Sequence, residues 1–281
     1  ILNKEYQNLN KLIENADSYA ASKDFRKKDF PVEFQVTNDS TIIDFKGIDY
    51  EKVHSDLTGT DWFKYGEKPT TFKIPYFNEI KPLKTVSLPE CYIIPPEWKS
   101  VINRIRLHGI KTYRINKTKS MKVTSCMFTN VNWNKTPFEG RHRIKNFEIE
   151  SYKKKESFPK GTVIVPMNQQ RARVIAHMLE PKAPDSFIKW GFFNAIFEQK
   201  EYAEIYVMEE KARKMLKENP SLRQKFEEKK KNNKEFANSP WAISNWFYRR
   251  TPYWDDQKNN YPVAKIFDQQ EYTRILKLVK Q

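Results

Sequence analysis

His177 and Glu180 have the spacing in this chain that comes closest to a catalytic pattern. They form a His-x-x-Glu pair, which can bring an imidazole and a carboxylate to one zinc ion. A catalytic zinc usually takes a third protein ligand, often a distant histidine. The other histidines, His54, His108 and His142, all precede this pair. We therefore expect His177 to be an exposed or hydrogen-bonded helix residue and Glu180 to cap or pair near a helix end, with no metal bound in this chain.

Two pairs of neighbouring carboxylates are the next candidates for chemistry. They are Glu198 with Glu201, and Asp255 with Asp256. Paired acids can divide acid and base work when burial separates their pKa values. The alternative, which we favour, is surface ion pairing to Lys200 or Arg249. No catalytic residue is therefore assigned from these pairs.

The sequence contains no recognisable motif for nucleophilic catalysis. No Gly-x-Ser-x-Gly elbow occurs, and Cys91 and Cys126 lack recognisable flanking residues. Two cysteines are too few for a disulfide scaffold or a thiolate zinc site, and whether they form one bridge stays open. The 7 glycines include no phosphate-binding loop.

The segment WFYRRTPYWDD, residues 246–256, is the most site-like arrangement in the C-terminal part of the chain. Arg249 and Arg250 can hold carboxylates through two parallel hydrogen bonds each. Tyr248, Tyr253 and Trp254 can stack on a sugar, a peptide or a guanidinium plane. A packed corner of arginines and aromatic rings is the alternative. We retain these five residues as candidate binding residues.

A second segment, residues 179–202, mixes aromatic and charged side chains to an unusual degree. We expect a turn and then a short helix capped by Asp185 or Ser186, with an apolar arc that includes Trp190. Such a mixture indicates either a polar network against a core or a recognition surface. Trp190, Glu198 and Glu201 are therefore further candidate binding residues, and the acidic residues are expected to anchor the fold.

Composition narrows the classes of function. The net charge is +16 and 14% of the residues are aromatic, which is typical of a basic globular protein. The lysine runs at 153–155 and 229–231 lie far apart, and glutamates dilute the second run, so we do not expect nucleic-acid binding. No apolar run is long enough for a membrane helix, and no signal peptide is evident at the start of the sequence.

Hydrophobic periodicity predicts an α+β protein in three parts. Residues 1–26 form a helical connector. Residues 27–167 form a β-rich, sandwich-like subdomain with an inserted helix at 98–107. Residues 168–281 form a mostly helical subdomain with an aromatic, loop-like C-terminal segment. The regular strand–helix alternation of a doubly wound parallel sheet is absent.

Four segments carry a resemblance to a known family. They are CYIIPPEWKSVINRIRLHGI, FPKGTVIVPMNQQRARVIAHMLEP, the 179–202 segment and FYRRTPYWD. In this order they resemble the C-terminal region of large bacterial zinc carboxypeptidase-like proteins of the carboxypeptidase A clan. The family's zinc ligands occur as His, Glu and a later His. Because no histidine follows His177, the resemblance carries no catalytic residue onto this chain.

The resemblance implies a non-catalytic accessory module. It would pack on its own upstream catalytic domain, which would hold the zinc, and would shape peptide access in the periplasm or outside the cell. The alternative is a carbohydrate- or peptide-binding module, in which Trp62, Trp133 and neighbouring tyrosines stack on a ligand. An active hydrolase built on His177 and Glu180 is the third hypothesis.

Overall fold

The computed structural model describes residues 2–279, and these divide into two compact units. Of the described residues, unit 1 comprises 2–88 and 168–186, and unit 2 comprises 89–167 and 187–279. Each unit is thus built from two separate stretches of the chain. The predicted parts, in contrast, were contiguous in sequence, so this interleaving was not foreseen.

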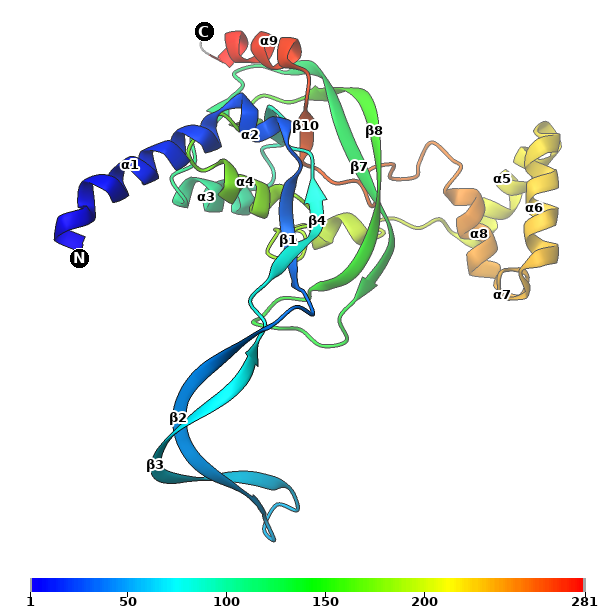
Figure 1. Ribbon diagram of the computed structural model, residues 1–281. Coiled ribbons are helices and arrows are strands. Elements are labelled where there is room, and N and C mark those ends of the chain that lie inside the picture. The colour runs from blue at the N-terminus through cyan, green and yellow to red at the C-terminus, as the bar shows by residue number, and fades with distance from the viewer. Residues whose placement is uncertain (1, 280–281) are drawn as a thin grey trace. The chain divides into compact units, whose positions relative to one another are not determined.

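Unit 1 combines helices with two antiparallel ribbons. Its helices are α1 (Leu2–Ala21), α2 (Lys23–Lys27) and α4 (Ala172–Leu179), and its strands are β1 (Phe30–Val36), β2 (Thr41–His54), β3 (Asp61–Tyr76) and β4 (Ile80–Val86). β1 pairs with β4, and β2 pairs with β3 as a long, twisted ribbon (Figure 1). Aromatic rings from α2, β1 and α4 meet, with Phe30 between Phe25 and His177. Burial of these rings holds the helices to the first ribbon.

Unit 2 is organised around one six-stranded antiparallel sheet. The strands are β5 (Cys91–Ile94), β6 (Tyr113–Arg114), β7 (Lys119–Trp133), β8 (Ile144–Phe158), β9 (Val163–Pro166) and β10 (Ala264–Ile266), in the order β6-β9-β5-β10-β7-β8. β5 and β9 are buried along their whole length. Apolar runs such as CYII and VIVP are typical of strands covered on both faces.

A core under this sheet is closed by the C-terminal helix α9 (Gln269–Val279). Tyr272 and Ile275 of α9 pack with Met121 and Val123 of β7 and with Phe158 at the end of β8. The inserted helix α3 (Lys99–Leu107) buries its apolar side as predicted, except that Leu107 is exposed. The last residue of a short helix turns away from the buried stripe because 3.6 residues complete one turn.

A second core of unit 2 lies within a group of four helices. They are α5 (Ile205–Glu218), α6 (Pro220–Asn232), α7 (Lys234–Ala237) and α8 (Pro240–Tyr248). Asn219, Asn233 and Ser239 accept hydrogen bonds from the first turns of α6, α7 and α8, respectively, which fixes where each helix begins. Phe226, Phe236 and Phe247 are buried together at the centre.

The expected helix after Asp185 is the clearest error of the sequence prediction. Residues 185–193 form turns, and only Asn194–Phe197 coil, as a short 3₁₀ helix, η1. Gly191 adopts a φ of 72°, which is incompatible with a continuous α-helix. Rings of this segment nevertheless pack against neighbouring elements: Phe193 contacts Trp98 and Phe197 contacts Phe128.

The α+β class is confirmed, with a β-rich region followed by a helical one. The strands form one large sheet and two ribbons. The segment expected to be loop-like near the C-terminus contributes β10, a strand between β5 and β7. Within residues 2–279, every helix is too short or too polar to cross a bilayer.

Candidate functional site

The His-x-x-Glu pair lies on α4 and at its end, in unit 1. The His177 ring packs edge-on against Phe30, with 5.4 Å between the ring centroids. Burial lowers the pKa of His177, opposed by the nearby Asp185 carboxylate, so a neutral imidazole is favoured. Glu180 is buried, and its amide donates to the carbonyl of Ala176 at the end of α4. Both residues therefore lie where a helix end meets a core.

The remaining histidines and the cysteines are placed in separate surroundings. His54 Nδ1 lies 3.0 Å from an Asp61 carboxylate oxygen on the β2–β3 ribbon. His142 contacts the carbonyl of Asn134 in the β7–β8 connection. Cys91 and Cys126 are buried and are not bridged to each other, and burial raises the pKa of the Cys91 thiol. Among residues 2–279 no three His, Cys, Asp or Glu side chains gather as metal ligands would.

The arginines of the 246–256 segment are brought together with its aromatic rings. The guanidinium carbon of Arg250 lies 3.6 Å from the centroid of the Trp246 ring, and that of Arg249 lies 5.3 Å from the centroid of Trp254. Arg250 also donates a 2.6 Å hydrogen bond to the carbonyl of Trp246 at the end of α8. Burial, together with the charge of Arg249, lowers the pKa of Arg250. We call Tyr248, Arg249, Arg250, Tyr253 and Trp254 the arginine corner.

The tyrosines of the arginine corner differ in accessibility. Tyr248 is buried, donates its hydroxyl hydrogen to the carbonyl of Tyr253, and packs edge-on against Trp254. Tyr253 is 64% exposed, and Lys211 Nζ lies 4.3 Å from its ring centroid. Tyr248 thus acts in the helical core, whereas Arg249 and Tyr253 face solvent. Only the exposed members of the corner are available to a ligand.

The other three candidate residues take separate positions. Trp190 carries the Arg143 guanidinium over its ring at 4.2 Å. Glu198 forms an ion pair with Lys200. The main-chain carbonyl of Glu201 accepts from Gln199, which also bonds to Asn245 of α8. The stretch 198–201 is thereby tied to α8, the helix that ends at the arginine corner.

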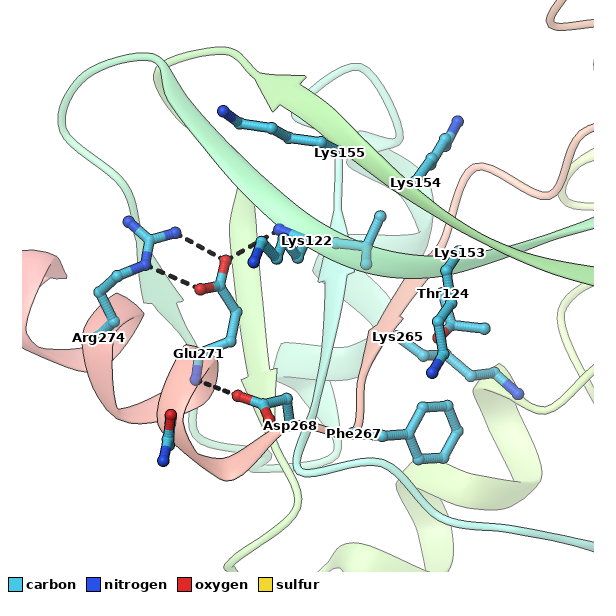
Figure 2. Close-up of a pocket in the computed structure, with 12 residues that line it drawn as sticks. Lys122, Thr124, Lys153, Lys154, Lys155, Lys265, Phe267, Asp268, Glu271 and Arg274 are labelled. Atoms are coloured by element: carbon cyan, nitrogen blue, oxygen red, sulfur yellow. Dashed lines mark hydrogen bonds and ion pairs between the residues drawn. The ribbon is translucent and has the colours of Figure 1, made fainter.

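A basic groove that sequence reasoning did not single out lies on the sheet of unit 2. It encloses about 720 Å³ beside β7, β8, β10 and the start of α9 (Figure 2). Five basic side chains, Lys122, Lys153, Lys155, Lys265 and Arg274, and two acidic ones, Asp268 and Glu271, line it, while Lys154 borders it with its ammonium paired to Glu156. The 153–155 run was noticed in the sequence. Its partners Lys122, Lys265 and Arg274 are far away in sequence and join it only through strand pairing.

The two carboxylates of the basic groove form hydrogen bonds within the protein. Glu271 accepts hydrogen bonds from Arg274 and, at 2.9 Å, from the backbone amide of Lys122 (Figure 2). Asp268 accepts the backbone amide of Glu271 at 2.6 Å and so caps α9. The bond to Arg274 is the main reason that the pKa of Glu271 is lowered. These contacts attach α9 to β7 and leave the groove with a positive potential.

Sequence comparison gives partial similarity to fungal carboxypeptidases. The chain is 29% identical over 111 residues to Carboxypeptidase 2 from Trichophyton rubrum, covering 40% of this chain and 20% of that protein. It is 29% identical over 107 residues to Carboxypeptidase 2 from Trichophyton tonsurans, covering 38% and 20%. A Probable carboxypeptidase 2 from Arthroderma benhamiae is 26% identical over 101 residues, covering 36% and 19%.

These similarities support a carboxypeptidase-like relationship and connect the chain to peptidase-related proteins. The matched part amounts to about one fifth of the length of these curated relatives. No family model and no solved structure matches the chain.

Proposed function

We propose that this chain is a non-catalytic accessory region of a zinc carboxypeptidase-like protein, packing on a catalytic domain and shaping the access of peptides to it. The partial similarity to carboxypeptidases supports the peptidase context. The accessory role is inferred mainly because the candidate zinc ligands lie in separate places, each in contact with other residues. His177 packs on Phe30, His54 pairs with Asp61, and Glu180 is buried at a helix end.

Exposed apolar faces support the packing part of this proposal. On helix α1, Tyr6, Leu9, Leu12 and Ile13 are 40–64% exposed, although their three- and four-residue spacing is that of a buried stripe. On the β2–β3 ribbon, Phe45, Tyr50 and Phe63 are about half exposed. Contiguous apolar surface of this kind is typical of a face that another domain covers.

The arginine corner is the proposed contact for peptides. Arg249 is exposed, and its position over Trp254 holds the guanidinium in place. A preoriented guanidinium loses less freedom when it binds a carboxylate. A carboxypeptidase hydrolyses the last peptide bond of a peptide that ends in a free carboxylate, so an accessory arginine that attracts this carboxylate would raise the local concentration of the peptide.

The non-catalytic assignment is tested by incubating the purified chain with an unblocked peptide, with and without added zinc. Mass spectrometry should find no shortened product in either case. Zinc-dependent removal of the C-terminal residue by the native chain, lost in His177→Gln, would instead establish the hydrolase hypothesis.

Peptide attraction is tested separately by fluorescence polarisation with one labelled peptide in two forms, a free C-terminal carboxylate and a C-terminal amide. We expect the native chain to prefer the carboxylate, and Arg249→Ala to remove most of that preference, a change of roughly threefold for an exposed ion pair. Arg213→Ala is the matched control, because Arg213 is an exposed arginine paired with Glu209 on α5. Equal binding of the two peptide forms would refute the role of the corner.

A binding module for glycans is a second candidate because of the β2–β3 ribbon. Trp62 is 49% exposed and Tyr65 is 72% exposed on this ribbon, and the ring of Tyr50 lies between those of Phe63 and Phe72. Exposed rings on a ribbon can stack on sugar faces. Trp133 is less suited, because it packs against His142 and Phe197. Binding of the chain to a glycan array, reduced in Trp62→Ala, would favour this candidate.

A further inference from the structure

The basic groove is formed by cations that face one another across the strands of one sheet. Lys122 on β7 lies directly opposite Lys155 on β8, and Thr124 lies between Lys153 on β8 and Lys265 on β10. Because alternate residues of a strand share a face, these lysines all stand on the same side of the sheet. Like charges directly opposite each other destabilise a strand pair. A bound anion would relieve this repulsion.

The neighbouring Lys154, in the same strand, is a lysine whose charge is paired. It points to the other face, where its ammonium lies 3.1 Å from the Glu156 carboxylate and 5.6 Å from the Tyr152 ring centroid. In the part of the chain that the structure describes, neither Lys153 nor Lys155 has a comparable ion pair or ring contact, and both are exposed. The run of three lysines is thus divided by the pleat into one neutralised and two available charges.

We infer that the basic groove binds an extended acidic peptide segment, with carboxylates placed on Lys122, Lys153 and Lys155. Lysines two residues apart on a strand are ~6.8 Å apart, which is also the separation of alternate side chains in an extended peptide. Acidic residues at every second position would therefore meet the lysines in register. This inference does not depend on the carboxypeptidase relationship, because it rests only on the geometry of the sheet.

The rest of the groove lining favours a peptide over a nucleic acid. Asp268 and Glu271 stand at the α9 end (Figure 2), where a continuous phosphate backbone would place charge against carboxylates. A peptide offers amide donors there instead. Phe267 is an isolated exposed ring, whereas binding of single-stranded nucleic acid generally uses several stacking rings. A lysine ammonium group acts as a point charge, so it can pair with a carboxylate as readily as with a phosphate.

The test is fluorescence polarisation with a labelled peptide of alternating glutamate and serine, measured on the full chain at low and at physiological salt. Lys153→Gln with Lys155→Gln should weaken binding roughly three- to tenfold, as expected for the loss of two exposed ion pairs. Lys154→Gln should leave the affinity within about twofold, because its charge is already paired on the opposite face. Lys225→Gln with Lys231→Gln, two exposed lysines of α6, is the control of equal net charge.

Each result decides the inference. Loss confined to the Lys153 and Lys155 variant supports it. Equal loss in the α6 variant would show a general attraction to a basic protein, and would overturn it. Tighter binding of an oligothymidylate of the same net charge would identify the groove as a nucleic-acid site, which would also overturn it, as would the absence of peptide binding at low salt. A melting temperature no lower than that of the native chain in every variant ensures that a loss of binding does not come from unfolding.

Discussion

The arginine corner and the basic groove both concentrate positive charge in unit 2, but they hold it differently. In the corner, each arginine lies over an indole ring, and Arg250 is also bonded to the main chain of α8. In the groove, Lys122 faces Lys155 across paired strands. Cations that stack on rings contribute to the fold, whereas cations that face each other oppose it. The same formal charge is therefore structural in one region and available for binding in the other.

The difference follows from the secondary structure that carries the residues. Helix α8 ends at Tyr248, and the turn that follows folds Trp254 back against it, so the cations and rings of one short segment can meet. The strands of the groove project alternate side chains at fixed intervals. Their lysines cannot reach the rings of the core, because those rings lie on the opposite face.

The largest expected effect comes from removing the ring beneath the corner. Phe247→Ala empties a position that is 2% exposed and packed against Phe226 and Trp246. The change should lower the free energy of unfolding by about 3–4 kcal/mol. Urea denaturation followed by tryptophan fluorescence should therefore show a midpoint at a lower urea concentration. Trp241→Ala, at a position that is 60% exposed, should change it by less than about 0.5 kcal/mol. A similar small loss for both variants would mean that α8 is not held by this core.

A smaller effect is expected at the acidic side chain of the groove. Glu271→Gln weakens the bonds to Arg274 and to the Lys122 amide and should cost about 1–2 kcal/mol at neutral pH. The pKa of Glu271 is lowered in the folded state from its ordinary value of 4.5. The ionised carboxylate therefore adds to the free energy of unfolding at pH values above 4.5, and this stabilisation is lost as the pH falls through the folded-state pKa. Denaturation curves of both proteins should therefore converge in acid. A constant difference at all pH values would refute the ionised role of Glu271.

The smallest effect should come from reversing one charge of the lysine pair. Lys155→Glu replaces a repulsive cross-strand pair by an attractive one and should stabilise the protein by about 0.3–1 kcal/mol at low salt. Salt should reduce the gain, because the side chains are exposed. Thermal melting at two salt concentrations measures both effects, with Lys231→Glu on α6 as the control. Destabilisation by Lys155→Glu would show that Lys122 and Lys155 do not repel each other.

Local structure was largely predictable from the sequence. The alternating runs STIIDFKGIDY and TTFKIPYF fall largely within β2 and β3, which extend beyond them, and the 269–279 stretch forms α9. The spacing of apolar residues within such a segment is enough to predict whether it forms a strand or a helix. The turn region around Gly191 was predicted wrongly, because its aromatic spacing resembled a helix while the backbone of Gly191 adopts a φ of 72°. Glycine tolerates that conformation, and its neighbours give no sign of it.

The candidate site was predictable in part. The arginine corner lies within one short segment, and the structure brings its residues together. Glu198 forms an ion pair with Lys200, the surface pairing favoured from the sequence. Trp190 instead contacts Arg143, which no local pattern specifies. Whether the corner binds a ligand stays a prediction for the peptide experiment.

The sequence by itself determined the elements, the basic charge and the composition of the arginine corner, because each depends on residues that are neighbours in the chain. Only the tertiary structure decided that Ala264–Ile266 enters the sheet between β5 and β7. That insertion places Lys265 in line with Lys153, and the pairing of β7 with β8 places Lys122 opposite Lys155. Strand register fixes which distant side chains share a face, and it is this register that turns scattered lysines into a groove.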